Sequence, residues 1–451
     1  MNPLLTNLVL NEGGCFRCAL RFSGELSLNN YLSVTSDYTS FLTKTQHPCT
    51  ICLGILNPNS YLNYTHNTIL ASNYEFNDYK FQVILPPIVY LRNEYILGKC
   101  KLSGINPVKV IEIKDVFKWM FSPSLGVLLN KKFNVDSDFR VNIDFGCSDS
   151  EEEVKRFYNE FGCRVKESLQ TVFKSVNHER LVACFPIVKN FLPEIKVSCS
   201  YAPVYVAGNY MKYSRKVSQT PWSVEGSSEV IDSVQDCLSR PLVEAFKSSG
   251  CTLHSSGRED IDVRMLGRGR PFILEIAESK SALSGFNKIN DLHNIINSSN
   301  EYVKVSPLKK VGKDYFDEIR KGEEGKLKVY SCIVWSEKSI SQSDMDYITS
   351  LPALELQQKT PIRVMHRRSL KTRQKFILKM QAYYINPHFF QLRLVSSAGT
   401  YIKEFVHSDF GRTTPSINKL LGCKTDILQL DVLGLGWDLE EVKDLLTSEI
   451  E

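Results

Sequence analysis

The sequence has no continuous run of about 18 apolar residues, the length that a membrane-spanning helix needs. Its opening segment, MNPLLTNLVLNEGGC, has no basic region and no long apolar core, so we expect no secretory signal. Glycine-rich loops with GxGxxG or GxxxxGK spacing are also missing, which argues against a nucleotide-binding enzyme and a Rossmann-type methyltransferase. There are no internal repeats or low-complexity segments. We therefore expect a globular protein that is neither secreted nor anchored in a membrane.

The composition is ordinary for a globular protein of two or three domains. Of the 451 residues, 43% are hydrophobic and 23% are charged, and the formal net charge is +5. This mild positive charge fits an RNA-binding protein but is too small to identify one. Thirteen cysteines in a chain without a secretory signal indicate thiols in a reducing compartment. We therefore expect a cytoplasmic or nuclear location, or both.

Residues 1–200 show the mixed pattern of an α+β domain. Apolar residues recur at spacings of three and four over residues 151–162, between acidic residues at the start and a glycine at the end, which predicts a helix. Short apolar runs elsewhere predict strands. The predicted strands cover residues 81–85, 109–113, 181–188 and 197–206.

Residues 201–451 have longer apolar runs and form the second of two predicted domains. A helix is expected over residues 228–247, with a kink or break at Pro241, which lies inside it. Long strands separated by helices predict a wide, mixed sheet. The predicted strands cover residues 270–277, 302–307, 328–335, 373–384 and 389–396.

Two CxxC pairs near the start of the chain predict a metal site. Each pair lets two thiolates on a tight turn meet one ion, and two pairs complete a tetrahedral zinc site with four ligands, Cys15, Cys18, Cys49 and Cys52. The separation between the pairs exceeds the usual zinc-ribbon spacing, so an insertion must loop out. Four unligated thiols are the alternative interpretation. A redox role is weaker, since it would need one CxxC pair only.

The segment 256–272 concentrates three carboxylates and four arginines on an aliphatic frame. One interpretation is a solvated turn beside a strand. The other is a site for an anionic polymer, in which arginines bind phosphates and a carboxylate performs the chemistry.

The string Gly257-Arg-Glu-Asp-Ile-Asp-Val-Arg264 resembles the catalytic segment of pseudouridine synthases, whose TruA branch has Gly-Arg-Thr-Asp-x-Gly-Val. The longer segment is similar to that of the archaeal and eukaryotic Pus-ten family of tRNA pseudouridine synthases. The two CxxC pairs match the family's zinc site, and further similar stretches are residues 205–222, 366–368 and 398–412. Ser408 is a departure, because the family usually has glycine there.

The resemblance implies a fold and an activity. Residues 201–451 would form a pseudouridine synthase catalytic domain, with a mixed, largely antiparallel central sheet and flanking helices. Residues 1–200 would form a zinc-binding, THUMP-containing α+β domain that binds RNA. The implied activity is that of an isomerase, converting uridine to pseudouridine in the tRNA T-loop at U54, U55 or both. The resemblance implies no organic cofactor, a monomer, and tRNA and other structured RNAs as partners.

The resemblance also implies roles for individual residues. Aligned on Gly-Arg-x-Asp, the catalytic aspartate falls on Asp260, whereas Asp262 is the lesser candidate and would hold Arg258 or Arg264. A strand would point both carboxylates to the same side. Around the catalytic aspartate, the basic partner falls on Lys403, the apolar contact of the flipped base on Ile402, and the ring that stacks on uracil on Tyr330. The expected RNA contacts are Arg258, Arg264, Arg268, His366, Arg367, Arg368 and Tyr401.

A non-catalytic, zinc-containing RNA-binding protein is the alternative function. It predicts that Asp260→Asn changes neither RNA modification nor its rate. A tRNA methyltransferase with a THUMP module would need a glycine-rich loop for the methyl donor, which the sequence lacks.

Overall fold

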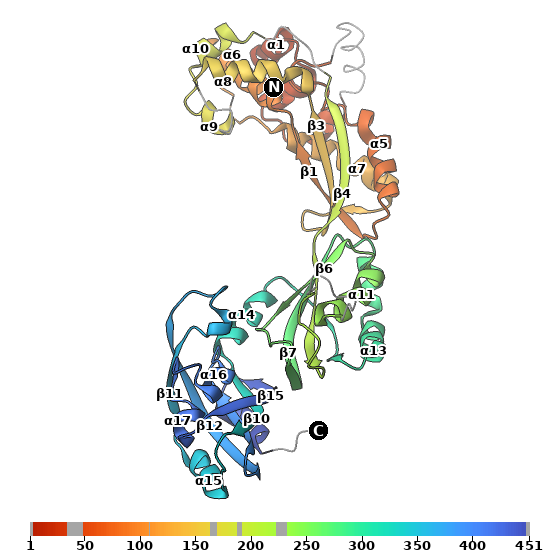
Figure 1. The fold of residues 1–451 in the computed structure, drawn as a ribbon. Coiled ribbons are helices and arrows are strands. Elements are labelled where there is room, and N and C mark those ends of the chain that lie inside the picture. Colours follow the sequence, from red (N-terminus) through yellow and green to blue (C-terminus); the bar gives the residue numbers. More distant parts are fainter. Residues whose placement is uncertain are drawn as a thin grey trace. The chain divides into compact units, whose positions relative to one another are not determined.

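The computed structural model describes residues 3–33, 48–107, 109–162, 169–186, 192–221 and 232–447. The chain divides into two compact units, Met1–Ala202 and Pro203–Glu451 (Figure 1). The boundary predicted from the sequence, after residue 200, lies two residues away. None of the helices described is both long and apolar enough to span a membrane.

The first unit contains a four-stranded sheet with the order β2-β1-β3-β4. Strand β1 is parallel to β2 and β3, and β4 is antiparallel to β3. Helices α5 and α7 lie alongside this sheet (Figure 1). The strands are β1 (Asp78–Ile84), β2 (Lys132–Phe133), β3 (Phe139–Gly146) and β4 (Glu194–Tyr201). The helices are α1 (Pro3–Asn11), α2 (Phe16–Phe22), α3 (Leu28–Leu32), α5 (Asn59–Ser72), α6 (Pro87–Leu102), α7 (Ile113–Leu129), η1 (Ser148–Ser150), α8 (Glu151–Glu160), α9 (Leu169–Phe173) and α10 (His178–Cys184).

Predictions for the first unit are confirmed for one helix and one strand, and are wrong for two strands. The helix at 151–162 is α8, and the strand at 81–85 is β1. The prediction of a strand at 109–113 is wrong. A backbone hydrogen bond joins Ile111 N to Arg21 O, but no strand forms there, and α7 begins at Ile113. The strand at 181–188 is also wrong where the structure describes it. Residues 181–184 belong to helix α10, capped by the Asn177 side chain, and residues 187 and 188 lie outside the described residues.

The predicted strand at 197–206 is two strands. Strand β4 ends at Tyr201, and β5 (Val204–Lys212) begins the second unit. Pro203 lies between them and has no N–H to donate to a ladder, which explains why the strand does not continue. The proline therefore marks the boundary between the two units.

The second unit is built on a mixed 11-stranded sheet. The main order is β14-β11-β12-β13-β10-β15-β7-β5-β8, and β6 pairs with β7 and β9 with β5. Among the described strands, the pairing of β15 with β7 is parallel and the others are antiparallel. The remaining strands are β6 (Gly250–Ser255), β7 (Val263–Ala277), β8 (Val303–Val305), β9 (Lys309–Val311), β10 (Leu327–Ser336), β11 (Leu354–Lys359), β12 (Thr372–Asn386), β13 (Phe389–Ser396), β14 (Thr413–Thr414) and β15 (Thr425–Gly436). The expected mixed, largely antiparallel sheet is confirmed.

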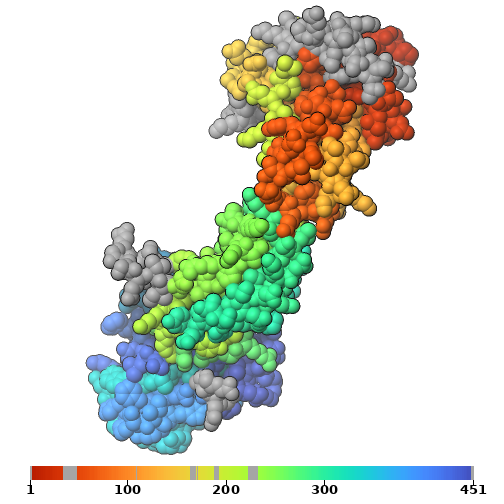
Figure 2. All heavy atoms as spheres, turned by 90° about the vertical axis from the view of Figure 1, so that its right-hand side faces the viewer, coloured from red at the N-terminus to blue at the C-terminus, as the bar shows by residue number. Residues whose placement is uncertain are grey.

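Helices of the second unit pack on this sheet and on one another. Helix α11 packs against β6 and β7, and the green atoms of α11 adjoin the teal atoms of α13 in Figure 2. The helices are α11 (Val234–Phe246), α12 (Ala282–Asn287), α13 (Ile289–Ser299), α14 (Tyr315–Gly325), α15 (Gln342–Ser350), η2 (Ile362–Val364), α16 (Ile402–His407), α17 (Ile417–Leu421), α18 (Leu439–Val442) and η3 (Lys443–Leu446).

The five strands predicted in this unit are present as β7, β8, β10, β12 and β13. The predicted helix at 228–247 is α11, which begins at Val234 after a capping box formed by Ser233 and Asp236. Residues 228–231 lie outside the described residues. Of the kink or break predicted at Pro241, the break is wrong, since α11 continues to Phe246. Its buried apolar face holds the helix together, because packing supplies most of the stability of such a helix.

Candidate active site

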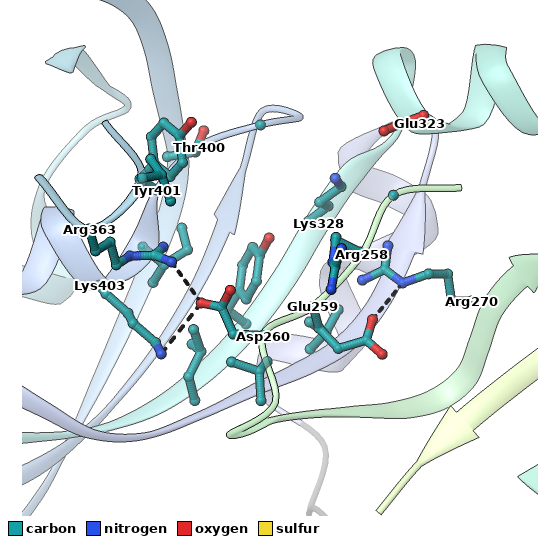
Figure 3. A pocket seen from close by; sticks show the side chains of 18 of the residues that line it. Arg258, Glu259, Asp260, Arg270, Glu323, Lys328, Arg363, Thr400, Tyr401 and Lys403 are labelled. Atoms are coloured by element: carbon teal, nitrogen blue, oxygen red, sulfur yellow. Dashed lines mark hydrogen bonds and ion pairs between the residues drawn. The ribbon is translucent and has the colours of Figure 1, made fainter. Parts of the chain in front are cut away.

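Asp260 lies in the loop that connects β6 to β7, so the alternation of side chains along a strand does not apply to Asp260 and Asp262. Its side chain is 37% exposed and faces a cavity of about 450 Å³ (Figure 3). The loop turns at Gly257, where φ is +85° and a Cβ atom would lie 3.1 Å from Nη1 of Arg270. Glycine adopts this backbone conformation without strain, whereas a Cβ atom would also crowd the Arg270 guanidinium.

A buried cation holds the backbone of this loop. Lys212, at the end of β5, donates hydrogen bonds from Nζ to the carbonyl oxygens of Val217, Asp260 and Ile261, at 2.9, 3.1 and 2.8 Å. The Lys212 side chain is fully buried, and this burial lowers its pKa to about 8. All three N–H groups of the ammonium are used, and two of them hold the loop at the consecutive carbonyl groups of Asp260 and Ile261.

The neighbouring Glu259 has a structural role. Its carboxylate accepts from Arg270 Nε at 2.9 Å and from the Tyr210 hydroxyl at 2.9 and 3.0 Å, and the Glu259 and Arg270 side chains are almost fully buried. Figure 3 shows Glu259 directed toward Arg270 and Asp260 directed toward Arg363 and Lys403. The loop thus buries one carboxylate in the protein and presents the next one to the cavity.

Two cations contact the Asp260 carboxylate. Arg363 Nη1 lies 2.9 Å from Oδ2, and Lys403 Nζ lies 3.5 Å from the same atom. Arg363 also donates from Nε to the buried Glu404 at 2.7 Å; burial lowers the pKa of Arg363, but the Glu404 and Asp260 carboxylates raise it above its usual value. Arg363 therefore bridges a buried carboxylate and the carboxylate in the cavity.

The closer partner of Lys403 is Asp262, at 2.6 and 2.9 Å. Burial raises the pKa of Asp262, but the hydrogen bond and charge of Lys403 outweigh this effect and hold it below its usual value. The expectation that Asp262 holds Arg258 or Arg264 is therefore wrong. Arg264 donates two hydrogen bonds to Asp431 instead, at 2.9 and 2.7 Å.

The cavity collects most of the residues that were predicted to act. Tyr330 on β10 and Ile402 at the start of α16 line its wall, and burial raises the pKa of Tyr330 to about 12. Four of the predicted RNA contacts also line it: Arg258, Arg367, Arg368 and Tyr401. Three do not: Arg268 and His366 are exposed elsewhere, and Arg264 is engaged by Asp431.

A second cavity of about 530 Å³ meets the first at Asp260. Its wall includes Ser218, Thr220 and Pro221, and it shares four residues with the first cavity: Arg258, Asp260, Arg367 and Lys403. Trp222, which follows Pro221 in the sequence motif, lies outside the described residues. The carboxylate of Asp260 is thus reached from two adjoining spaces, both bordered by arginines.

Two protein-family models match this chain and show the family to which it belongs. A family model described as Pus10, C-terminal, matches residues 205–436, and one described as eukaryotic Pus10, N-terminal, matches residues 49–174. The chain belongs to the Pus10 family. It is accordingly an isomerase of the pseudouridine synthase class.

Individual relatives agree with the family models. The human protein named tRNA pseudouridine synthase Pus10 is 33% identical over 413 residues, covering 85% of this chain and 77% of the human one. The Pus10 protein of Pyrococcus furiosus is 35% identical over 251 residues, covering 54% of this chain and 60% of its own. Among solved structures, a Cbf5-Nop10-Gar1 complex matches with a TM-score of 0.26 and 12% identity, over 51% of this chain and 49% of that one.

The residues that the sequence interpretation missed are those that hold the predicted ones. Arg363 contacts Asp260, Lys212 holds the loop of Asp260, and Glu404 contacts Arg363. These interactions join distant parts of the chain. Lys328 also lines the cavity. It lies two residues before Tyr330 on the same face of β10, so the alternation of side chains along a strand could have indicated it.

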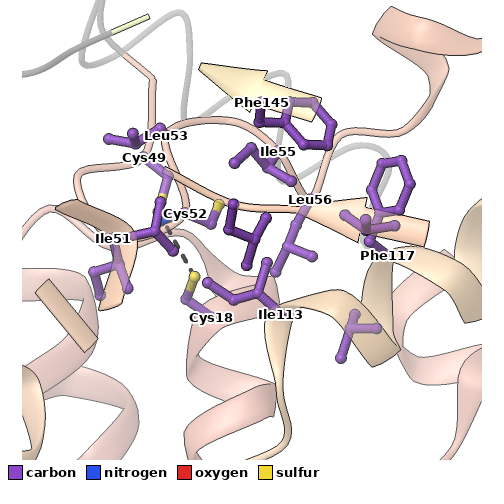
Figure 4. Close-up of a cluster of buried hydrophobic side chains, with 14 of the residues drawn as sticks. Cys18, Cys49, Ile51, Cys52, Leu53, Ile55, Leu56, Ile113, Phe117 and Phe145 are labelled. Atoms are coloured by element: carbon purple, nitrogen blue, oxygen red, sulfur yellow. Dashed lines mark hydrogen bonds between the residues drawn. The ribbon is translucent and has the colours of Figure 1, made fainter. Parts of the chain in front are cut away.

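In the first unit, the four predicted metal ligands gather in one buried cluster. Figure 4 shows three of them, Cys18, Cys49 and Cys52. The sulfur atoms of Cys15, Cys18, Cys49 and Cys52 lie within 4.8 Å of one another, and the Cys15–Cys52 and Cys18–Cys49 distances are 3.9 and 3.8 Å. Zinc–sulfur bonds of about 2.3 Å in a tetrahedron place sulfurs roughly 3.8 Å apart, so the cluster fits such an ion. Between the pairs, residues 19–33 contain the end of α2 and all of α3, whereas residues 34–47 lie outside the described residues.

Proposed function

We propose that the protein isomerises uridine to pseudouridine in the T-loop of tRNA, at U55, U54 or both, with Asp260 as the catalytic carboxylate. The observation that carries this proposal is the Asp260 carboxylate, facing a cavity of about 450 Å³ and contacted by Arg363 and Lys403. A space of this size can take a nucleotide that has left the base stack. Membership of the Pus10 family supports the substrate, because the relatives are named tRNA pseudouridine synthases.

The reaction balances without a second substrate. The N1–C1′ bond of uridine breaks, the uracil turns, and C5 bonds to C1′; C5 loses one proton and N1 gains one. An ionised carboxylate directed at the ribose can attack C1′ or remove a proton from the sugar. Arg363 and Lys403 orient Asp260 for either step, and because they are fixed before substrate arrives, no reorganisation is needed during the reaction.

Tyr330 and Ile402 can hold the uracil. Because burial raises the pKa of Tyr330 to about 12, this side chain is a neutral phenol near pH 7. A neutral aromatic ring in the wall of the cavity suits stacking on the base better than accepting a proton. Ile402 is 3% exposed and offers an apolar contact beside it.

The arginines around the two cavities can bind the phosphates that flank the target uridine. Arg258 and Arg367 border both cavities, and Arg368 and Tyr401 border the first. We assign Arg268 and His366 to RNA outside the cavities, since both are exposed. Arg264 has a bidentate partner in Asp431, so we assign it to the support of β7 and β15.

We assign one structural zinc ion to Cys15, Cys18, Cys49 and Cys52, and an RNA-binding role with a THUMP module to residues 1–200. The sulfur distances support the zinc site, and the match to the N-terminal family model supports the accessory role. Other structured RNAs as partners, a monomeric state and a cytoplasmic or nuclear location remain predictions.

The test is single-turnover conversion of uridine in an unmodified tRNA transcript, with saturating enzyme. Asp260→Asn removes the charge from a nearly isosteric side chain, so we expect essentially complete loss of conversion with tRNA binding retained. Asp262→Asn is the matched control two residues away, and it should keep measurable activity. An active Asp260→Asn beside an inactive Asp262→Asn would overturn the assignment of the catalytic carboxylate.

A further inference from the structure

The loop Ser408–Gly411 has an unusual backbone. Its four residues, which follow α16, have φ angles of +72°, +51°, +56° and +82°, all in the left-handed region. Residues with a Cβ atom disfavour this conformation by about 1–2 kcal/mol each, and Ser408, Asp409 and Phe410 all adopt it. Such strain persists where the surrounding structure imposes it, and it concentrates at functional sites.

The surrounding structure fixes this loop firmly. Thr413 N and Gly411 N both donate to Ser408 O at 3.1 Å, which closes the turn. The Asp409 carboxylate is buried and accepts from Ile362 N at 3.2 Å. Because Ile362 precedes Arg363, the loop is anchored to the segment that contacts Asp260.

Phe410 is directed into solvent from this anchored loop. Its side chain is 95% exposed, the largest value among the exposed large hydrophobic residues described. An exposed phenylalanine adds no core packing, and its bulk is disfavoured at positive φ. The folding of the described residues therefore gives no reason for an aromatic ring at this position.

We propose that Phe410 is a platform on which an unpaired base of the RNA substrate stacks, next to the entrance used by the target uridine. Proteins bind single-stranded RNA by combining cations that follow the phosphates with aromatic rings that take successive bases. Both components are present here, because Arg363, Arg367 and Arg368 line the cavity, and Arg363 follows Ile362, to which the loop of Phe410 is anchored. A ring on an anchored loop loses little freedom when a base stacks on it. The proposal rests on the RNA substrate proposed above.

Equilibrium binding of an unmodified tRNA transcript to the Phe410→Ala variant of the full chain tests the stacking platform. Stacking on an aromatic ring is worth enough that the variant should bind roughly 5- to 150-fold more weakly. The slope of log affinity against log salt should stay unchanged, since no phosphate contact is removed. Phe410→Trp should bind as the wild type does, whereas Phe410→Leu, apolar without a π-face, should bind as weakly as Phe410→Ala.

Tyr347→Ala is the matched control, because Tyr347 is an exposed aromatic residue on α15 that lines neither cavity. It should leave tRNA affinity unchanged. Wild-type affinity in Phe410→Ala, or in Phe410→Leu, would overturn the stacking platform while leaving tRNA conversion by the wild type intact. A wild-type protein that neither binds nor converts tRNA would instead overturn the proposed function. The two failures are therefore distinguishable.

Discussion

At the scale of single residues, the two cations beside Asp260 differ in what else they hold. Arg363 is shared with Glu404, whose Oε1 it contacts and whose Oε2 is buried without a hydrogen-bond partner among the described residues. Lys403 is shared with Asp262, which is 62% exposed. Removing Arg363 therefore leaves a buried charge without compensation, whereas removing Lys403 leaves a carboxylate that water can solvate.

We predict that Arg363→Met lowers the single-turnover rate roughly 30- to 1000-fold, the effect of losing a preorganised electrostatic partner worth about 2–4 kcal/mol. Lys403→Met should cost less, because its contact with Asp260 is longer. The double variant Arg363→Met/Glu404→Gln should regain the stability lost in Arg363→Met. It should not regain the wild-type rate. Recovery of both would show that Arg363 acts on folding alone.

The ammonium of Lys328 makes the folded state sensitive to pH. Burial and the charge of Arg270 lower its pKa to about 8, whereas an unfolded chain has a lysine pKa of about 10.4. The charge of Glu323 acts in the opposite direction but does not cancel this effect. Between the two pKa values the unfolded state binds more protons, so this group makes the free energy of unfolding rise with pH.

We predict that the wild type gains stability relative to Lys328→Met as the pH rises from 8 to 10, by at most about 1.4 kcal/mol per pH unit. Denaturant unfolding of both proteins at several pH values measures the difference. Lys212, whose pKa is also lowered to about 8, is present in both proteins and cancels. A difference that is constant with pH would show that Lys328 keeps an ordinary pKa.

At the scale of elements, the turn after α16 shows how a departure from a family pattern can be compensated. Ser408 has a φ of +72°, a conformation that glycine adopts without strain. Its hydroxyl, however, accepts a hydrogen bond from Gly411 N at 2.9 Å, which glycine could not do. The side chain thus offsets part of the strain that its own Cβ introduces.

We predict that Ser408→Ala lowers the free energy of unfolding by about 0.5–1 kcal/mol, because it keeps the strain and loses the hydrogen bond. Ser408→Gly should change it by less, since relief of strain balances the lost bond and the greater freedom of the unfolded chain. Denaturant unfolding of the two variants measures this contrast. Equal destabilisation by alanine and glycine would contradict the role of the backbone.

The length of an apolar run does not by itself decide whether a strand prediction holds. The runs at 328–335, 389–396 and 181–188 are equally long, yet the first two form strands β10 and β13, whereas residues 181–184 form part of helix α10. A short apolar run fits either a buried strand or a buried helix, and periodicity alone does not distinguish the two. The motif around Asp260 located the carboxylate, but Arg363 is 103 residues away, and no local pattern relates the two.

At the scale of the whole molecule, the cavities proposed for catalysis and the cysteine cluster proposed for zinc belong to different units. Every residue that lines the two cavities at Asp260 lies in Pro203–Glu451, and the four clustered cysteines lie in Met1–Ala202. Each unit has its own sheet. The RNA affinity proposed for the first unit can therefore be tested separately from the chemistry proposed for the second.

Cys15→Ser separates RNA affinity from chemistry, because it removes one of the four clustered thiols. We predict about one zinc ion per chain in the wild type and loss of most of it in the variant, together with unfolding of the first unit, because metal binding there contributes to folding free energy. Binding of tRNA should weaken and its log-salt slope become shallower, since phosphate contacts are lost. The single-turnover rate at saturating enzyme should stay close to that of the wild type, because Asp260 and its partners are untouched.

Cys184→Ser, at an exposed cysteine outside the cluster, is the matched control and should change neither metal content nor binding. Metal analysis, tRNA binding at several salt concentrations and single-turnover kinetics on the three proteins complete the test. A wild-type protein that is fully folded without zinc would show that the first unit needs no structural metal. A Cys15→Ser variant that lacks the metal and loses the fold of the first unit, yet keeps the wild-type affinity and salt slope, would show that this unit contributes no phosphate contacts.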